Sequence, residues 1–446
     1  MRPLRTLASA LAVTIAITSC SNPQGTQQTG ADDHTPGAPH PAQGVSDDAV
    51  VLGTHQPLTG PASPGFRHVS TGARAVFDYI NDNGGIHGRR IEYQVQDDSF
   101  DPAQTIEATR SLIKDHEIFA MLGGLGTPTH EAVIDELNEE GVPDLFVSSG
   151  ALAWDQPEVY PYSYGFQVDY SKEAKIQGAF IAENFPGDKV GLLYQNDDVG
   201  PSSHAGIEQY LTEEIVAWES YDPGVPELAG QIEALKESDA EIAVCYCIPA
   251  FLGMAVLESA AIGYTPQWVA PSFGGDVEIV TALIEEYSQG TPAEDMPPEA
   301  FLDELIITAF LPMAAQSKDP WTAFFHEIHE EYNSGTPFTD TTVYGMVQAV
   351  LFAQVLMETG PDLTRQSLLD TLHSREWAGP GLVPFAATED DHSGYSGVMV
   401  VQHNAGEEPE VLQEPMITDS DGGEILPFDL ERPDPEEVTL FGGESR

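Results

Sequence analysis

Residues 49–95 read AVVLGTHQPLTGPASPGFRHVSTGARAVFDYINDNGGIHGRRIEYQV and carry the clearest fold signal in the chain. The apolar run at 50–54 predicts a strand, and apolar residues between 73 and 80 recur at i, i+3, i+4 and i+7, which predicts one buried helix face. Gly84-Gly85 predicts the end of that helix, and the alternation at 91–95 predicts a second strand. This order of elements is typical of a βαβ unit with two parallel strands.

The same alternation continues along most of the chain. Asp101-Pro102 predicts an N-cap followed by the first residue of another helix. Repeated βα units predict an α/β fold with helices on both faces of parallel sheets, and their number is too large for one open sheet, so we expect two lobes. Further strands are predicted at 118–122, 142–147, 189–194 and 241–247, with helices at 128–140, from Ser171, and near Gly206.

The composition narrows the classes of partner. The 446 residues include 72 Asp plus Glu against 17 Lys plus Arg, a formal net charge of −55. Such a field repels nucleic acid and anionic membrane surfaces, so we exclude both as binding partners. We expect a halophilic protein that works in concentrated salt, where screening over a few ångströms weakens self-repulsion. Loss of the fold on dialysis to low salt would support this expectation, and unchanged stability would contradict it.

The N-terminus predicts export. Arg2 and Arg5 precede an apolar run at 7–17 that is shorter than the roughly 20 residues of a membrane-spanning helix, so we predict a cleaved signal over 1–20. Its end, Ile17-Thr18-Ser19-Cys20, resembles a bacterial lipoprotein signal in which Cys20 becomes lipidated; an ordinary cleaved signal is the alternative. Residues 21–48 are polar and rich in Gly and Pro, which predicts a flexible linker.

The remaining two cysteines, Cys245 and Cys247, lie two apart in an apolar run and point to one face of a strand. A bridge between them would close a very small ring, and no second pair completes a zinc site. We therefore expect buried free thiols, with a metal or redox role as the alternative.

The loops that follow predicted strands are the places to expect a ligand. The loops at 123–129 and 148–151 contain small residues and hydroxyls before a helix, which suits a carboxylate at free backbone N–H groups. The same residues are also ordinary turn formers. The remaining loops at strand ends are 57–66, 195–203 and 271–275.

Several short motifs occur along the chain in a set order and spacing. They are Pro57-Leu58-Thr59-Gly60-Pro61, Gly72-Ala73, Ile80-Asn81, Gly84-Gly85-Ile86-His87-Gly88-Arg89, Asp97-Asp98, Asp101-Pro102 with Ala108, Gly141-Val142-Pro143, Tyr194-Gln195-Asn196-Asp197-Asp198 with Gly200, Tyr344-Gly345, and Gly360-Pro361-Asp362-Leu363-Thr364. Together they resemble the substrate-binding proteins of ABC transporters, of the leucine/isoleucine/valine-binding family with the type I periplasmic binding protein fold. The resemblance covers about residues 49–405.

The resemblance implies two Rossmann-like lobes joined by three crossovers, with the ligand between them. On this basis we predict lobe 1 at 49–168 plus 305–385, lobe 2 at 169–304 plus 386–415, and an acidic C-terminal tail at 416–446 that lies on the surface or is disordered.

The resemblance also implies positions for the ligand contacts. It places the ligand's carboxylate against the first and second loops, and the closing side of lobe 2 at the residue before its first helix. Phe66 and Trp154 are loop aromatics that suit a pocket wall or ordinary packing. The implied contacts are Thr127, Ser149, Gly150 and Ala151 for the carboxylate, Tyr170 for lobe 2, and Val199, Pro249 and Ser272 for the remaining loops.

Two departures from the family pattern bear on the ligand. Amino-acid binders of the family hold the ammonium with an acid in lobe 2, but after Ala270 no acid occurs before Asp276. A buried ammonium without a counter-charge is costly, so either Asp276 or another carboxylate reaches the ligand, or the ligand lacks an amino group. Val199 stands where many members have Tyr. Branched-chain amino acids, aromatic acids and other short carboxylates therefore stay open as ligands.

The implied function is the extracytoplasmic, lipid-anchored solute-binding component of an ABC importer, which needs permease and ATPase partners and no cofactor. An enzyme is disfavoured: His326 and His329 lack the spacing of a zinc protease and are expected on a solvated helix face, and Ser148 and Ser149 have no base beside them in the sequence. A ligand-sensing receptor domain and a purely structural surface protein also stay open as functions.

Overall fold

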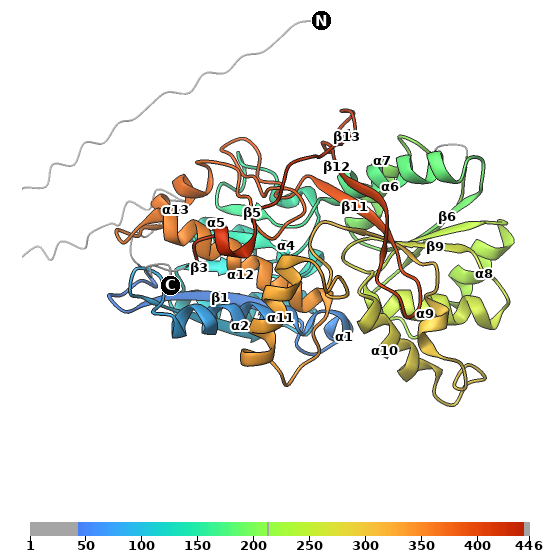
Figure 1. The fold of residues 1–446 in the computed structure, drawn as a ribbon, viewed down its shortest axis with the longest axis horizontal. Coiled ribbons are helices and arrows are strands. Elements are labelled where there is room, and N and C mark those ends of the chain that lie inside the picture. Colours follow the sequence, from blue (N-terminus) through green and yellow to red (C-terminus); the bar gives the residue numbers. More distant parts are fainter. Residues whose placement is uncertain (1–42, 212–213, 441–446) are drawn as a thin grey trace, which may run out of the picture. The chain divides into compact units, whose positions relative to one another are not determined.

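The computed structural model describes residues 43–211 and 214–440, which form two α/β lobes, each built on its own sheet (Figure 1). The sheet of lobe 1 has the order β2-β1-β3-β4-β5 and is parallel throughout. The sheet of lobe 2 has the order β13-β12-β11-β10-β9-β8-β6-β7. It is parallel from β7 to β10 and antiparallel from β10 to β13. This architecture confirms the predicted fold class.

The bounds of the elements are as follows. The strands are β1 Ala49–Gln56, β2 Arg90–Asp97, β3 Ala120–Leu122, β4 Asp144–Val147, β5 Ser163–Gly165, β6 Val190–Gln195, β7 Ile215–Tyr221, β8 Ile242–Tyr246, β9 Gln267–Ala270, β10 Ile306–Ala309, β11 Gly397–Gln402, β12 Glu410–Ile417 and β13 Leu426–Pro427. The α-helices are α1 Ser63–Phe66, α2 Val69–Asp82, α3 Pro102–Lys114, α4 Thr127–Glu131, α5 Ile134–Glu139, α6 Tyr170–Asn184, α7 Val199–Ile207, α8 Ala229–Glu237, α9 Pro249–Ala261, α10 Val277–Ser288, α11 Pro320–Tyr332, α12 Asp340–Thr359 and α13 Arg365–Leu372. Short 3-10 turns are η1 Leu152–Trp154, η2 Pro298–Phe301 and η3 Pro435–Glu437.

The first βαβ unit forms as its sequence predicts. β1 and β2 pair in parallel along their whole length, and α2 buries the predicted apolar face. Gly85, after α2, has φ +70°, and a Cβ on it would lie 2.0 Å from the carbonyl oxygen of Arg89. Only glycine fits this turn, so the end of the helix predicted at Gly84-Gly85 is confirmed.

The start of α3 also matches its prediction. The Asp101 side chain accepts hydrogen bonds from the backbone N–H groups of Ala103 and Gln104, and Pro102 is the first helical residue. Such a cap is worth about 1 kcal/mol. It fixes the end of the loop that carries Asp98 and Phe100.

The helix predicted at 128–140 is two short helices, α4 and α5. The break falls at Val133, whose N–H donates to the carbonyl oxygen of His130 and not to that of Thr129, as it would in a continuous α-helix. Val133 is fully buried, so packing against the sheet outweighs the helical pattern of the sequence here.

The buried helix α12 is held against lobe 1 by two glycines. A Cβ on Gly345 would lie 1.8 Å from the carbonyl oxygen of Val69, and one on Gly72 would lie 2.1 Å from that of Thr342. The backbones of α2 and α12 touch there, so a side chain at either glycine would separate the helices. This contact fixes the first turn of α12, which carries Asp340.

One predicted lobe boundary is wrong. Residues 305–309 were expected in lobe 1, but β10 lies in the sheet of lobe 2, where Ile306 pairs with Val269 of β9 and Ile307 with Val401 of β11. The chain therefore passes to lobe 1 after Ala309. All of β10 is buried, and a short buried run of this kind suits either sheet equally.

The predicted linker ends earlier than residue 48. Gln43 donates a hydrogen bond from Nε2 to the carbonyl oxygen of Ile113, and a Cβ on Gly44 would lie 2.2 Å from the backbone N of Phe119. Residues 43–48 are therefore packed against lobe 1. The signal at 1–20, Cys20 and the linker up to residue 42 lie outside the described residues.

The tail predicted at 416–446 is ordered as far as the structure describes it. Residues 416–417 belong to β12, the chain then forms β13, and Leu440 is buried in the core of lobe 1. Arg432 pairs with Asp319, and Trp321 donates from Nε1 to the carbonyl oxygen of Pro433 at 2.8 Å. Of the two expected alternatives, the surface location agrees with the described part of the tail, where a few apolar and planar side chains anchor a largely exposed acidic segment.

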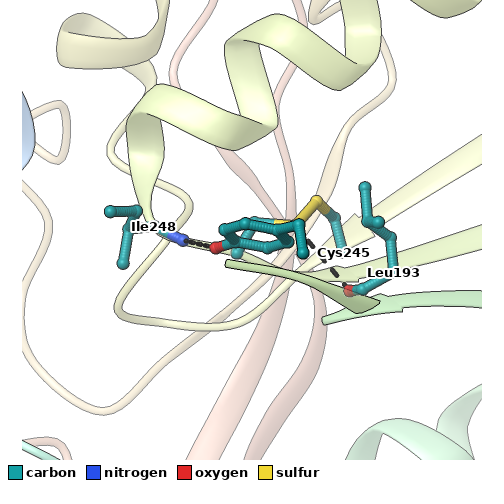
Figure 2. The surroundings of a disulfide bond; sticks show 5 residues. Leu193, Cys245 and Ile248 are labelled. Atoms are coloured by element: carbon teal, nitrogen blue, oxygen red, sulfur yellow. Dashed lines mark hydrogen bonds between the residues drawn. A yellow bond between two sulfur atoms is a disulfide. The ribbon is translucent and has the colours of Figure 1, made fainter. Parts of the chain in front are cut away.

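The two cysteines are buried, as expected, but they are not free thiols: Cys245 and Cys247 form a disulfide (Figure 2). The chain turns at the end of β8, where the N–H of Cys247 donates back to the carbonyl oxygen of Cys245 at 2.8 Å. This turn sets the two Cα atoms 5.1 Å apart, within the range that a disulfide spans. Sequence spacing alone assumed an extended strand. Ile248, the next residue, faces the cavity described below.

Among the described residues, no helix combines the length and apolar character needed to cross a membrane.

Candidate ligand-binding cleft

A cavity between the lobes collects residues from both sheets. It contains about 920 Å³ of space free of protein atoms, part of it open to solvent, which is within the roughly 300 to 1,000 Å³ of small-molecule pockets. Its walls come largely from loops at the carboxyl ends of parallel strands, where open α/β sheets bind ligands. The apolar lining residues are Phe66, Val69, Phe100, Leu125, Val199, Ile248, Phe273, Ile307, Ala309, Phe310, Leu311, Pro312 and Met313, and the polar ones are Thr127, Ser148, Gln167, Tyr170, Gln195, Ser272, Asp276, Thr308, Asp340, Thr341 and Tyr344.

Three hydroxyl groups meet at one end of the lining. Thr127 Oγ1 lies 2.8 Å from Ser149 Oγ and 3.1 Å from Tyr170 Oη, and Ser149 Oγ lies 3.4 Å from Tyr170 Oη. All three residues are buried. Burial raises the pKa of Tyr170 far above its usual range, so its phenol stays protonated and can donate a hydrogen bond. Hydroxyls of this kind suit an oxygen-rich ligand group such as a carboxylate.

Gly150 brings the two lobes together at this cluster. A Cβ on Gly150 would lie 2.7 Å from the ring of Tyr170, and its carbonyl oxygen accepts a hydrogen bond from the N–H of Tyr170 at 2.9 Å. The loop after β4 and the start of α6 are therefore in direct contact. Ala151 donates its N–H to Ser149 Oγ at 3.2 Å and so orients that hydroxyl.

Five of the ten contact residues that the sequence indicated lie in the cavity lining. Thr127, Tyr170, Val199, Ser272 and Phe66 line the cavity. The remaining residues lie behind its wall. Among these, Ser149, Gly150 and Ala151 support the hydroxyl cluster.

Trp154 and Pro249 are likewise supports rather than lining residues. Trp154 is 1% exposed and donates from Nε1 to the carbonyl oxygen of Ser149 at 3.1 Å. Pro249 packs against Gly65 in α1, where a Cβ would lie 3.0 Å from the proline ring, and its neighbour Ile248 reaches the cavity instead.

Two carboxylates line the same cavity, Asp276 fully buried and Asp340 partly buried. Asp276, the N-cap of α10, accepts hydrogen bonds from the N–H of Ile279 at 3.2 Å and of Thr341 at 2.9 Å. Asp340, the first residue of α12, accepts one from the N–H of Ala314 at 2.6 Å. Burial raises the pKa of Asp276, and burial together with the charge of Asp276 raises that of Asp340.

No residue of the cavity lining within the described ranges is Lys, Arg or His. The two carboxylates are therefore held by backbone N–H groups and neighbouring threonine hydroxyls, without a cation in the lining. Desolvated charges of the same sign favour a cation between them, because it would offset both the burial and their mutual repulsion.

A third carboxylate is buried behind the lobe 2 wall. Glu173 Oε1 accepts from the N–H of Ser272 at 2.7 Å and from Thr308 Oγ1 at 2.5 Å. Burial raises its pKa to about 7. Glu173 fixes two lining residues but does not itself line the cavity.

The apolar wall includes a residue in a conformation uncommon for a side chain of its size. Phe100 has φ +58°, and its N–H donates to Asp98 Oδ1 at 2.9 Å. Its sequence context, a loop after a strand, offered no reason to select it. Asp340, Phe310 and Met313 were also missed, because they lie far along the chain from the other lining residues and only the fold brings them to the cavity.

The described residues contain no group of three His, Cys, Asp or Glu side chains placed to hold a metal ion. The expectation of a solvated helix face for the two histidines of α11 is wrong for His329, which is 2% exposed and bonds through Nε2 to the carbonyl oxygen of Thr336 at 3.0 Å. His326 is half exposed.

Two α/β lobes that line one cavity with backbone amides, hydroxyls and apolar side chains define a solute-binding protein. The chain belongs to the periplasmic binding protein family, whose model matches residues 49–408. Proteins of this family lie outside the cytoplasm, and the chain's relatives are binding proteins rather than enzymes.

The relatives agree on the class and differ in the ligand named. The chain is 22% identical over 289 residues to a leucine-, isoleucine-, valine-, threonine- and alanine-binding protein of Pseudomonas aeruginosa, covering 62% of this chain and 74% of that one. It also resembles the structure of a branched-chain amino acid ABC transporter protein from Thermus thermophilus with bound valine, with TM-score 0.71, 15% identity, and coverage of 84% and 98%. A fatty acid ABC transporter substrate-binding protein from Thermomonospora curvata matches with TM-score 0.71, 17% identity, and coverage of 86% and 96%. These structural likenesses establish the fold.

Proposed function

We propose that this protein is the extracytoplasmic solute-binding component of an ABC importer and that its ligand is an amino acid with an apolar side chain. The observation that carries the proposal is the lining of the cavity, which contains two desolvated carboxylates, a hydroxyl cluster and many apolar side chains but no basic residue among those described. The amino-acid ligands named for the Pseudomonas and Thermus proteins point the same way.

The carboxylate of the ligand would meet the hydroxyls of Thr127, Ser149 and Tyr170. These groups bond to one another, and each can turn its proton toward a carboxylate oxygen. Hydrogen bonds to a charged acceptor are about twice as strong as neutral ones, so the exchange favours binding.

The ammonium of the ligand would lie at Asp276 and Asp340. Binding a cation there lowers the cost of keeping both carboxylates ionised, so each gains stability only in the complex. A ligand without an amino group would not offset the cost of keeping the two buried carboxylates ionised. The side chain would then contact the apolar wall, which includes Phe66, Phe100 and Met313.

Closure of the lobes would couple binding to transport. Tyr170 and Ser272 belong to lobe 2 and Thr127 to lobe 1, so a ligand that touches all three favours the state in which both walls reach it. The permease and ATPase subunits of the importer would recognise that state and move the ligand. Lipidation of Cys20 would hold the protein at the outer face of the membrane, and a Cys20→Ala variant would then be released into the medium.

Thermal shift of the mature protein in high salt tests the ligand class. Three sets are compared: apolar amino acids, aromatic amino acids, and carboxylates without an amino group. A ligand at 100 times its Kd adds roughly 2.7 kcal/mol and raises the midpoint by several degrees. A shift confined to amino acids supports the proposal, a shift with plain carboxylates moves the protein to the organic-acid branch, and no shift with any set contradicts it. A sensor domain would bind ligand but would not restore uptake in an importer that lacks its binding protein.

A further inference from the structure

Four buried side chains in lobe 1 form one continuous hydrogen-bonded chain, which we call the Asp-His-His-Asp chain. His55 Nδ1 lies 2.8 Å from Asp98 Oδ2, His55 Nε2 lies 2.8 Å from His130 Nδ1, and His130 Nε2 lies 2.8 Å from Asp144 Oδ2. All four residues are 0% exposed. They come from the end of β1, the loop after β2, α4 and the first residue of β4, so the chain links three strands of the sheet through α4.

The three hydrogen bonds fix the number of protons on the chain. Each bond needs one proton between its two heavy atoms, so the chain holds three. Two ionised carboxylates and two neutral imidazoles hold only two protons. Without a third, one of the three contacts would set two lone pairs against each other at 2.8 Å in a site that water does not reach.

We propose that the Asp-His-His-Asp chain takes one additional proton from solvent when the protein folds, and that this shared proton positions the loops that contact the ligand. The net charge of the chain is then −1, from two carboxylates and one imidazolium, or from one carboxylate, one protonated carboxyl and two neutral rings. The role in positioning the ligand-contact loops rests on the proposed function, whereas the uptake of a proton does not.

Burial and hydrogen bonding indicate where the extra proton lies. Burial lowers the pKa of His55 below its usual value, which favours a neutral His55 that donates from Nδ1 to Asp98 and accepts at Nε2. His130 then donates from both ring nitrogens and is the imidazolium, with Asp144 as its partner. Asp144 Oδ2 also accepts from Ser163 Oγ at 2.7 Å, and Asp98 Oδ2 from Thr105 Oγ1 at 3.3 Å.

Two loops that line the ligand cavity contact this chain directly, and a third segment behind the cavity wall is reached through Trp154. A Cβ on Gly124 would lie 2.5 Å from His130 Nδ1 and 2.7 Å from His55 Nε2. The backbone of the loop that leads to Thr127 therefore packs directly against the hydrogen bond between the two histidine rings. Asp98 Oδ1 accepts from the N–H of Phe100 and so holds its left-handed backbone.

The third segment is reached through Trp154. Its ring lies edge-on to the ring of His130 at 5.0 Å, and its Nε1 bonds to the carbonyl oxygen of Ser149. A change in the protonation of the chain therefore acts on Thr127, Phe100 and Ser149 together.

The elements packed around the chain carry mostly acidic groups, and the basic Arg110 and Lys114 of α3 lie beside Glu136. Glu131 on α4 has a pKa raised by burial, and Asp97 and Asp101 in the loop after β2 accept backbone N–H bonds from Leu58, Thr59 and the start of α3. None of these three carboxylates bonds to a ring nitrogen of the chain in the described structure. The extra proton is thus held by the chain's own geometry and favoured by the surrounding negative charge.

The first test counts protons in the ligand-free, full-length mature protein. With ¹⁵N-labelled histidine, the NMR spectrum at neutral pH should show three exchange-protected ring N–H protons on His55 and His130 together. A count of two together with ¹³C shifts of ionised carboxylates for both Asp98 and Asp144 overturns the proposal, because both rings are then neutral and the chain holds no third proton. This count depends neither on a ligand nor on a variant that folds.

The second test asks whether the shared proton positions the loop. Hydrogen–deuterium exchange of the segment 123–130 should be faster in His55→Gln and in His130→Gln than in the wild type. His329→Gln is the matched control, because His329 is also buried in lobe 1 but bonds to a backbone carbonyl and to the Asn333 amide instead of a carboxylate. Equal exchange in all four proteins would overturn the positioning role.

If the wild type binds L-leucine, His55→Gln should raise its Kd about tenfold and His329→Gln should not, as for a residue coupled to a site that it does not touch. Equal affinity for all variants would overturn the positioning role while leaving the proton count standing. Absence of L-leucine binding in the wild type would bear on the proposed ligand, and the first two tests would still decide the proposal.

Discussion

The protein buries pairs of carboxylates in two regions, and the hydrogen-bond partners of the carboxylates differ between the two. In the Asp-His-His-Asp chain, Asp98 and Asp144 each face an imidazole at 2.8 Å, and a further proton in the chain offsets part of their charge. At the cavity, Asp276 and Asp340 face backbone N–H groups and each other, and burial raises the pKa of both. The hydrogen-bond network of the Asp-His-His-Asp chain is complete within the protein. The network at Asp276 and Asp340 would be completed by a ligand. The predictions below test that distinction from the largest expected effect to the smallest.

Removing a ring from the complete network should be the most damaging change. His130→Leu removes the ring that bonds to both Asp144 and His55 in a site closed to water, and breaking a buried pair in this way costs about 3 to 5 kcal/mol. Chemical denaturation in high salt measures the loss. The control His329→Leu removes bonds to a backbone carbonyl and to an amide, neither of them charged, and should cost about 1 to 2 kcal/mol. Equal losses for the two variants would show that the chain is no more important than an ordinary buried histidine.

Neutralising a carboxylate of the incomplete network should destabilise the protein far less. Asp276→Asn keeps an acceptor for Ile279 and the cap of α10 but removes the charge and the second oxygen, which accepts from the N–H of Thr341. The ligand-free variant should lose at most about 1 kcal/mol at pH 8, because removing a charge that burial disfavours offsets the lost hydrogen bond. Amino-acid affinity should fall by about 3 kcal/mol, the typical cost of losing one partner of a buried charge pair.

Asp340→Asn is the companion variant and should behave in the same way. Calorimetric titration and thermal melts measure both effects on the same samples. A loss of stability without a loss of affinity would place the pair among the structural networks instead.

Glu173 provides an intermediate case, since it has two hydrogen-bond donors but no cation. Its pKa is raised by burial from an ordinary value of 4.5 to about 7. A raised carboxyl pKa contributes stability that is fully present below 4.5 and is lost as the pH rises through about 7. The wild type should therefore lose about 2 kcal/mol relative to Glu173→Gln between about pH 5 and pH 8. Urea denaturation at intervals over this range measures the difference, and parallel curves for the two proteins would contradict the assignment.

The smallest effect is expected at the hydroxyl cluster. Thr127→Val removes one hydroxyl from the three and keeps the shape of the side chain, so affinity should fall by about 1 to 2 kcal/mol with little change in stability. Thr127→Ser retains the hydroxyl and should bind nearly as the wild type does. If valine at this position leaves the Kd unchanged, the ligand carboxylate lies elsewhere.

The sequence predicted those parts of the fold that depend on neighbouring residues. The apolar spacing within α2, the cap at Asp101 and the glycine turn after α2 are each decided within one helical turn or loop. The failures all involve distant partners or local bends. β10 is four buried residues that suit either sheet, α4 and α5 part where Val133 packs, and the disulfide depends on a backbone turn at the end of β8.

The cavity shows the same limit. Thr127, Tyr170 and Ser272 were indicated by their place in family motifs, and Asp276 by its distance from Ala270 in the sequence. Asp340 lies far along the chain from Asp276, and His130 lies 75 positions after His55, so only the folded chain brings these pairs together. Sequence patterns in a single chain carry no signal for such long-range pairs.

The most direct test of the central claim compares two ligands that differ only in the amino group. Titration calorimetry in high salt would measure L-leucine and 4-methylpentanoate against the wild type and Asp276→Asn. We expect L-leucine to bind the wild type about 100-fold more tightly than 4-methylpentanoate, and this preference to fall markedly in Asp276→Asn, because the ammonium then keeps Asp340 as its one carboxylate partner. Equal or tighter binding of 4-methylpentanoate by the wild type would contradict the account and would assign the cavity to carboxylates without an amino group.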